Sequence, residues 1–193
     1  MDNFYRAAGG FEGLRRQLDE AGDEAWIYHN IRGSFYQAEW TRLVNGYYLW
    51  ISPLRVHVPW MYYSFKGSPF DATDGPQGKG GDFAYAVPDP ADPARMVPTR
   101  LWEAFREGVD DMRYLKTLEL LIEGHADAGR TAAARAWLDN LRRDVTPTRE
   151  QLEPIEKESP VLVFLGERLD GPLYRRIRRQ AAEHIVELAP VDD

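Results

Sequence analysis

The chain has 193 residues, 44% apolar and 12% aromatic, and its 24 lysines and arginines against 31 carboxylates give a net charge of −7. This length is typical of one domain with a substantial core, and the aromatic content excludes an intrinsically disordered chain. The acidic balance argues against nucleic-acid or anionic-membrane partners, and the absence of cysteine excludes disulfides and thiolate chemistry.

The spacing of apolar residues and the positions of glycine and proline predict alternating helices and strands in the first half of the chain. Apolar residues at helical spacing predict a helix over Phe11–Ala21. Short aromatic and β-branched runs predict strands over Ala25–Asn30 and Arg55–Ser64, and Pro59 requires an irregularity in the second because it lacks a ladder donor. Between the two strands, a helix is expected over Gln37–Trp50.

Two loops and a series of helices follow. Residues 66–81 and 89–98 are rich in glycine, proline and aspartate and are expected to be loops, with a short strand over Phe83–Val87 between them. Thr99 is the expected N-cap of the strongest helix, which runs to about Glu123. Further helices are expected over Thr131–Arg143, Arg149–Glu158 and Pro172–Leu188. Strands that alternate with helices indicate an α/β fold built from parallel βαβ units.

Three segments together carry a family pattern. They are the strand Trp26–Tyr28, the helix and strand of Arg42–Tyr63, and a run that starts at Gly81, passes through a proline loop and continues into the long helix as far as Leu115. The run contains the predicted strand segment Gly81-Asp82-Phe83-Ala84-Tyr85 and then the pattern E-x-x-R-x-G-x-x-D-x-x-Y-L over Glu103–Leu115. This combination resembles the C-terminal part of glycoside hydrolase family 123-like proteins, over about residues 24 to 124.

The resemblance implies a partial (β/α)8 TIM-like barrel. Residues 1–124 would supply the last three strands and helices, and residues 125–193 would form an all-α tail packed on the barrel. The implied activity is N-acetylhexosaminide hydrolysis by an adjacent Asp–Glu pair, with the acetamido group of the substrate as nucleophile. That pair would lie upstream of residue 1. The dipeptides Asp19–Glu20 and Asp23–Glu24 precede the first strand, on the rim opposite a barrel active site, and are expected to be solvated.

Aromatic and polar residues fall at or near the predicted strand ends. Aromatic rings stack on the apolar faces of sugars, a carboxylate accepts sugar hydroxyls, and an arginine at the start of the long helix lies nearest the rim. The candidate substrate-binding residues are therefore Tyr28, Asn30, Trp60, Tyr62, Asp82 and Arg100.

Most of these candidates have a structural alternative. Trp60 and Tyr62 are equally compatible with core aromatics between barrel and helices, and that interpretation is favoured for Trp26. For Asp82 the favoured alternative is a turn residue that bonds its own backbone. Arg100 has the alternative of packing or surface pairing. The charged residues of the first helical turns are expected to form i, i+4 pairs and a polar network that holds this helix to the strands.

Two functions follow as hypotheses. The first is a C-terminal portion of a glycoside hydrolase-like protein whose main catalytic carboxylates lie outside this chain. The second is a non-catalytic carbohydrate-binding or scaffold fragment that pairs with another chain, because three strands leave open edges.

The expected partners are a carbohydrate and the missing N-terminal half of the barrel or a second copy. No cofactor, metal, nucleic acid or membrane is expected. The chain is expected to be soluble, and its localisation stays open.

Overall fold

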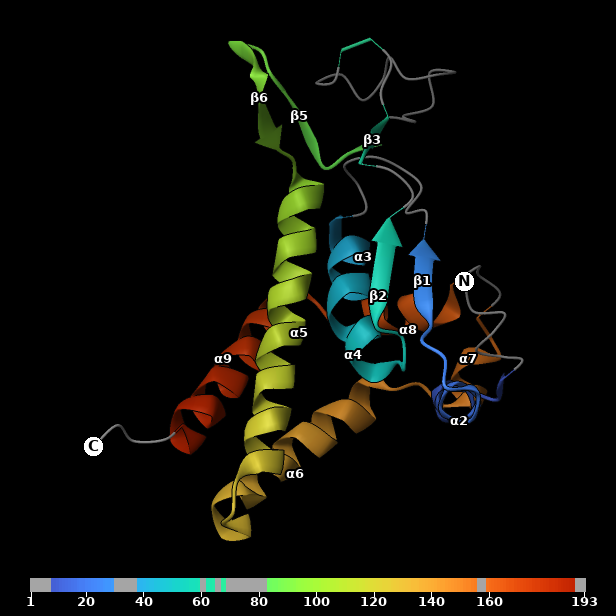
Figure 1. Cartoon of the computed structure of the whole chain (residues 1–193), viewed down its shortest axis with the longest axis vertical. Coiled ribbons are helices and arrows are strands. Elements are labelled where there is room, and N and C mark those ends of the chain that lie inside the picture. The colour runs from blue at the N-terminus through green and yellow to red at the C-terminus, as the bar shows by residue number, and fades with distance from the viewer. Residues whose placement is uncertain are drawn as a thin grey trace.

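The structure is a computed structural model that describes residues 8–29, 38–59, 62–64, 67–68, 83–155 and 159–189. These residues form a mixed α/β fold with long helices and short strands (Figure 1). In chain order the elements are α2 (Phe11–Ala21), β1 (Trp26–His29), α3 (Ala38–Leu43), the π-helix η1 (Val44–Tyr48), α4 (Leu49–Ile51), β2 (Val56–Pro59), β3 (Tyr63–Ser64), β4 (Phe83–Ala84), β5 (Ala86–Asp89), β6 (Asp92–Pro98), α5 (Arg100–Gly124), α6 (Ala128–Val145), α7 (Arg149–Leu152), α8 (Pro160–Arg168) and α9 (Gly171–Leu188).

A parallel βαβ unit forms the sheet side of the molecule. β1 and β2 pair in parallel, with Trp26 opposite Val56 and Tyr28 opposite Val58, and the helical segment α3–η1–α4 connects them. Side chains alternate across a strand, so Ile27 is buried against the helices while Trp26 and Tyr28 point away, each 62% exposed. The prediction of a parallel βαβ unit is confirmed here, and the core interpretation of Trp26 is wrong because its side chain lies on the uncovered face.

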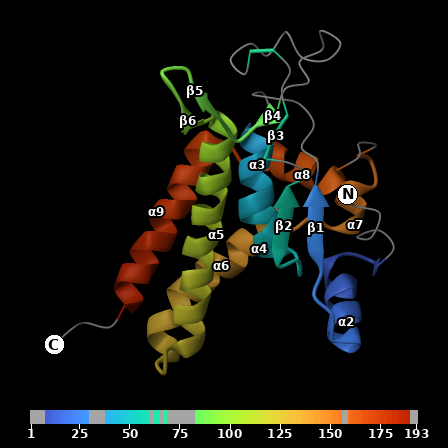
Figure 2. The ribbon, with the colours of Figure 1, turned by 45° about the horizontal axis from the view of Figure 1, so that its top comes forward.

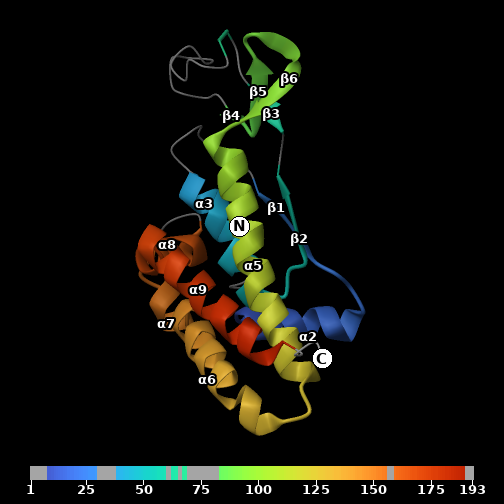
Figure 3. The same cartoon turned by 90° about the vertical axis from the view of Figure 1, so that its left-hand side faces the viewer.

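Most of the helices lie on one side of the two strands, and α2 lies near the strands themselves (Figure 3). Figure 3 shows β1 and β2 along one margin of the molecule, with α3, α8 and α9 toward the other margin. Both α3 and α5 begin at the end of the molecule to which β1 and β2 point, and both run back against the direction of the strands (Figure 2). α5 packs against α3, η1 and α9. This arrangement of strand and antiparallel helix is the repeating unit of βα folds.

The prediction that the strand over Phe83–Val87 is a third parallel strand is wrong. Phe83 and Ala84 pair antiparallel with Tyr63 and Ser64, and they do not extend the parallel pair. The strand predicted over Arg55–Ser64 is correspondingly divided, because β2 ends at Pro59 and β3 belongs to another small sheet. Antiparallel pairing needs no crossover helix, and no described helix separates β3 from β4.

The loop predicted over residues 89–98 is also wrong, because most of it is β6. This strand pairs antiparallel with β5, placing Ala86 opposite Pro98 and Val87 opposite Val97, and every residue of β6 is exposed. Asp89 closes the turn by accepting a hydrogen bond from the Ala91 N–H over 2.9 Å. A two-stranded hairpin has open edges, where a proline loses no ladder hydrogen bond, so the prolines that suggested a loop are compatible with strands.

Helices with a clear apolar stripe agree with prediction. α2 has the predicted bounds, and α5 begins after Thr99, whose hydroxyl accepts from the Leu101 N–H as an N-cap. α6 and α9 lie close to their predicted ranges, whereas α7 is limited to Arg149–Leu152. α8 was not predicted. Its Pro160–Leu165 segment is buried throughout and therefore has no amphipathic periodicity to detect.

Two glycines allow the helical segment α3–η1 to approach α5 closely. A Cβ built on Gly46 would lie 3.0 Å from the Gly108 carbonyl oxygen, and a Cβ on Gly108 would lie 2.5 Å from the Arg42 carbonyl oxygen. Within η1, Asn45 donates to the Thr41 carbonyl over 2.8 Å, and its Oδ1 lies 2.9 Å from His57 Nδ1 on β2. The π-helical turn thus joins the strand layer to the helix layer.

The buried core lies between these helices and includes residues from both halves of the chain, among them Tyr47, Trp50, Leu118, Leu162 and Leu165. Trp50 also donates through its indole N–H to Glu119 over 3.0 Å, and Arg142 lies over the Trp50 ring and pairs with the same carboxylate. Among the helices that the structure describes, none is long and apolar enough to cross a membrane.

Candidate functional site

The carboxyl ends of β1 and β2 point toward the small antiparallel sheets (Figure 2). Tyr28 lies near this end of β1 and is 62% exposed, and Tyr62 follows β2 and is 48% exposed. Arg100 is the first residue of α5 and is exposed. The other three predicted contacts, Asn30, Trp60 and Asp82, lie outside the described residues.

An aromatic cluster connects this end of the sheet to α5. Tyr62 and Tyr85 have ring centroids 6.2 Å apart, and Tyr85 meets Phe105 edge-on at 5.7 Å. Phe105 also stacks with two rings: that of Trp102, with centroids 6.0 Å apart, and that of His57 of β2, with centroids 6.4 Å apart. We call these five residues the aromatic cluster. Edge-to-face and offset stacked contacts at such distances are favourable for aromatic rings.

Backbone contacts around Thr99 hold the cluster in place. The Thr99 hydroxyl lies 2.6 Å from the Ala84 carbonyl oxygen, and the Thr99 N–H donates to the Tyr85 carbonyl over 2.9 Å. The Tyr85 N–H in turn donates to the Tyr62 carbonyl over 3.0 Å. The N-cap of α5 therefore fixes the segment that carries Tyr85 and Tyr62 against the first turns of α5.

The aromatic cluster has a buried centre and an accessible rim. Tyr85 is 2% exposed, and burial raises the pKa of its hydroxyl to about 12. Trp102 is 40% exposed and Tyr62 is 48% exposed, so both present ring surface to solvent. The alternative that Tyr62 is a fully covered core aromatic is wrong. Exposed indole and phenol rings on a fixed base are suited to stacking against the apolar face of a sugar ring.

Sequence reasoning did not find Tyr85 or Trp102 as site residues. The signal for Trp102 is its spacing of three from Phe105 in the first turns of α5, which places both rings on one side of the helix. Tyr85 has no such local signal, because its position depends on the hydrogen bond to Tyr62 across residues far apart in sequence.

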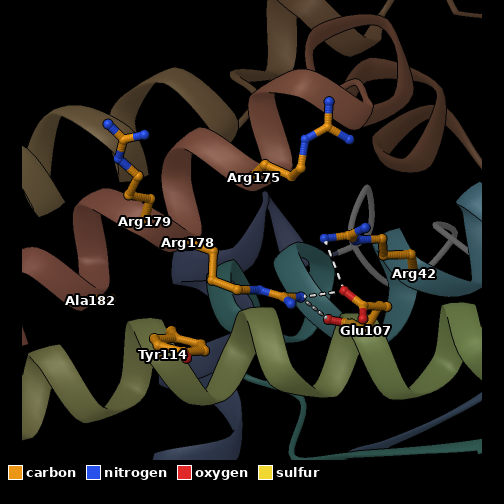
Figure 4. Close-up of a pocket in the computed structure, with 7 residues that line it drawn as sticks. All are labelled: Arg42, Glu107, Tyr114, Arg175, Arg178, Arg179 and Ala182. Carbon is orange, nitrogen blue, oxygen red and sulfur yellow. Dashed lines mark hydrogen bonds and ion pairs between the residues drawn. The ribbon is translucent and has the colours of Figure 1, made fainter.

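A second polar feature joins α3, α5 and α9. Asp111 of α5, with a side chain only 1% exposed, accepts from Arg42 Nε over 2.7 Å and from Arg178 Nη2 over 2.6 Å. Glu107, one turn earlier, lies 2.8 Å from Arg178 and 3.6 Å from Arg42 (Figure 4). Arg42 also lies over the ring of Tyr174, 4.2 Å from its centroid. We call Arg42, Glu107, Asp111 and Arg178 the ion-pair network.

Electrostatics in the ion-pair network follow from burial and charge. Burial alone would raise the pKa of Glu107, but Arg178 and then Arg42 outweigh it and hold this pKa below its ordinary value. Burial, reinforced by Asp111, raises the pKa of the neighbouring Tyr47 hydroxyl. Two guanidinium groups facing two carboxylates neutralise one another, as expected for a polar network that holds α5 in place.

The other charged groups singled out in the sequence lie at the exposed surface. Arg106 pairs with Asp110 one turn later, at 3.3 Å, and with Glu103 at 2.9 Å, both at the exposed surface. The Asp19–Glu20 and Asp23–Glu24 dipeptides are exposed and precede β1, away from the carboxyl ends of the strands. Among the described residues, no group of three or more histidines and carboxylates is arranged to hold a metal ion.

Comparisons with known proteins found no match. No protein-family model matches the chain, and no curated protein or solved structure is detectably similar to it.

Proposed function

We propose that this chain is the C-terminal portion of a glycoside hydrolase-like protein. It supplies closing βα units of a TIM-like barrel together with part of a carbohydrate-binding surface, and the main catalytic carboxylates are expected outside this chain. The parallel β1–α3–β2 unit, followed by α5 packed beside α3, supports this proposal because a TIM-like barrel repeats this unit.

The observation that carries the proposal is the position of the aromatic cluster at the carboxyl ends of β1 and β2. Active sites of βα barrels lie at this end of the strands. Trp102 and Tyr62 offer accessible ring faces there, Tyr28 reaches the same end of β1, and Arg100 begins the adjacent helix. In this proposal these side chains contact the sugar directly, and Tyr85 and Phe105 support them from beneath.

The uncovered face of β1 supports a contribution to a larger barrel. Parallel sheets in globular proteins are normally covered on both faces, yet Trp26 and Tyr28 lie on the face away from the helices and are each 62% exposed. In a barrel this face points inward and is covered by side chains of other strands. The missing N-terminal half of the barrel is therefore a proposed partner.

Saccharide binding tests the proposal through two tryptophans. Trp102→Ala removes a ring of the aromatic cluster, and Trp26→Ala removes an exposed ring at the opposite end of β1 as the matched control. We expect N-acetylglucosamine oligosaccharides to perturb the tryptophan fluorescence of the wild-type chain. The Trp102→Ala variant should bind at least about tenfold more weakly, a typical effect of losing one stacking contact. No saturable binding, or equal losses in both variants, would contradict the proposal.

A hydrolysis assay tests the location of the catalytic groups. We expect the isolated chain to leave a chromogenic N-acetylhexosaminide intact, because its Asp–Glu dipeptides precede β1 and are away from the aromatic cluster. Turnover by the purified chain, removed by changes within that cluster, would show that the catalytic carboxylates are present after all.

The second candidate is a non-catalytic carbohydrate-binding or scaffold fragment that pairs with another chain. The open edges of the β1–β2 pair favour it, since the described part of this sheet contains only two strands and unpaired edges bind further strands. Sedimentation analysis over a range of concentrations separates the two candidates. Self-association that Trp26→Ala weakens favours pairing with a second copy, whereas a monomer at all concentrations removes that form of the second candidate.

A further inference from the structure

A pocket of about 440 Å³ lies beside the ion-pair network, between α9 and the helices α3 and α5 (Figure 4). Its lining contains four arginines and a single carboxylate. Among the lining residues are Arg42, Glu107, Tyr114, Arg175, Arg178 and Arg179. This concentration of guanidinium groups is unusual in a chain with a net charge of −7.

Two of the arginines are fixed in place but keep free donors. In both Arg178 and Arg42, the Nε atom donates to Asp111, and the Nη2 atom contacts the carboxylates of both Asp111 and Glu107. The Nη1 atom of each makes no hydrogen bond with a described residue. The aromatic rings of Tyr174 and Tyr114 lie under these guanidinium groups, at 4.2 and 5.9 Å. These donors are therefore ordered before any ligand arrives, which lowers the entropic cost of binding.

The other two arginines carry positive charge that the network does not neutralise. Arg175 and Arg179 are four residues apart, so they lie one turn apart on the same side of α9, and both line the pocket with Arg178. Arg175 makes no ion pair with a described residue, and Arg179 pairs only with the exposed Glu183 on its own helix, at 3.1 Å. An exposed pair of this kind contributes little and is easily exchanged for a ligand.

The charge balance defines the ligand class. Arg42 and Arg178 are balanced by Glu107 and Asp111, which leaves the two charges of Arg175 and Arg179 in excess at the pocket. A phosphate group carries close to two negative charges near neutral pH and several acceptor oxygens, and arginine forks bind it through paired hydrogen bonds. The volume is in the range of small-molecule sites.

We propose that this pocket, on the helix side of the molecule, binds the phosphate group of a small molecule, either free phosphate or a phosphate monoester. The proposal is independent of saccharide binding at the aromatic cluster, because no residue is shared between the two sites.

Calorimetric titration with inorganic phosphate tests the proposal, in chloride buffer of constant ionic strength at pH 7.5. Saturable binding is expected, and Arg175→Ala should weaken it about tenfold, as for the loss of a charge-assisted hydrogen bond. Arg176→Ala is the matched control, since it removes the same charge from the adjacent exposed position, which does not line this pocket. Arg179→Ala should resemble Arg175→Ala.

Further arms identify the source of the phosphate and the cause of a failure. Glucose 6-phosphate binding more tightly than inorganic phosphate points to a monoester, and the reverse points to the free ion. Acetate should bind at least about tenfold more weakly, because it carries one charge. Trp102→Ala should leave phosphate binding unchanged. The proposal is overturned if phosphate does not saturate, if acetate binds equally well, or if Arg176→Ala weakens binding as much as Arg175→Ala does. Thermal unfolding in phosphate-free buffer verifies that each variant is folded.

Discussion

The close approach of α3–η1 to α5 makes Gly108 a sensitive position. A Cβ added there would lie 2.5 Å from the carbonyl oxygen of Arg42 and 3.1 Å from the Cβ of Asn45. Optimal separations of carbon from its neighbours begin near 3.5 Å, so the Gly108→Ala change requires the two backbones to separate by about 1 Å. The obstacle is backbone, and rotation of a side chain cannot relieve it.

The magnitude follows from two opposed effects. Replacing glycine by alanine within a helix gains about 1 kcal/mol through helix propensity. Overpacking a well-filled contact costs about 1–3 kcal/mol, and a backbone obstacle belongs at the upper end of this range. We therefore expect Gly108→Ala to lower the free energy of unfolding by about 2 kcal/mol. The separation of the helices should also lengthen the contacts between Arg42 and Asp111 across the same interface.

Urea denaturation followed by circular dichroism measures the effect. The control is Gly124→Ala in the same helix, where an added Cβ meets nothing within 4 Å. Because Gly124 is the last residue of α5, the control should change stability by roughly 0.5 kcal/mol or less, in the stabilising direction. If Gly108→Ala is as stable as the wild type or as the control, the helices do not approach as described, and the reasoning is refuted.

Two further changes test the buried charges and hydroxyls. Asp111→Ala leaves Arg42 and Arg178 without their shared carboxylate and should cost about 3 kcal/mol in urea denaturation, since these arginines keep partial access to water; a loss below about 1 kcal/mol would contradict a stabilising network. Burial raises the pKa of Tyr85 to about 12, above its unfolded value near 10, so the folded state holds this proton more tightly. Its contribution is complete below pH 10 and declines as the pH rises from 10 through 12, with a loss of about 2 kcal/mol between these two pH values. Denaturation between pH 8 and 11.5 should show this decline, which should become smaller in Tyr85→Phe, and equal declines in both proteins would count against it.

Local sequence information determined the helices that have one apolar face. The stripe over Phe11–Ala21 and the N-cap at Thr99 predicted α2 and the start of α5, because side-chain spacing and capping act within a few residues. The parallel pairing of β1 with β2 also followed from the alternation of strand and helix. The prediction of a polar network that holds α5 to the strands was right about Asp111 and wrong about its partners, because Asp111 pairs with Arg42 of α3 and Arg178 of α9.

Tertiary structure decided features whose partners lie far apart in the chain. Arg42 and Asp111 are 69 residues apart, and no local pattern connects them before the helices pack. The buried helix α8 has no polar face, so periodicity could not reveal it. Tyr85 entered the aromatic cluster only through its antiparallel surroundings and the hydrogen bond to Tyr62. Composition and spacing thus determined which segments fold locally, whereas long-range packing decided which of them meet, because contacts between distant residues depend on the whole fold.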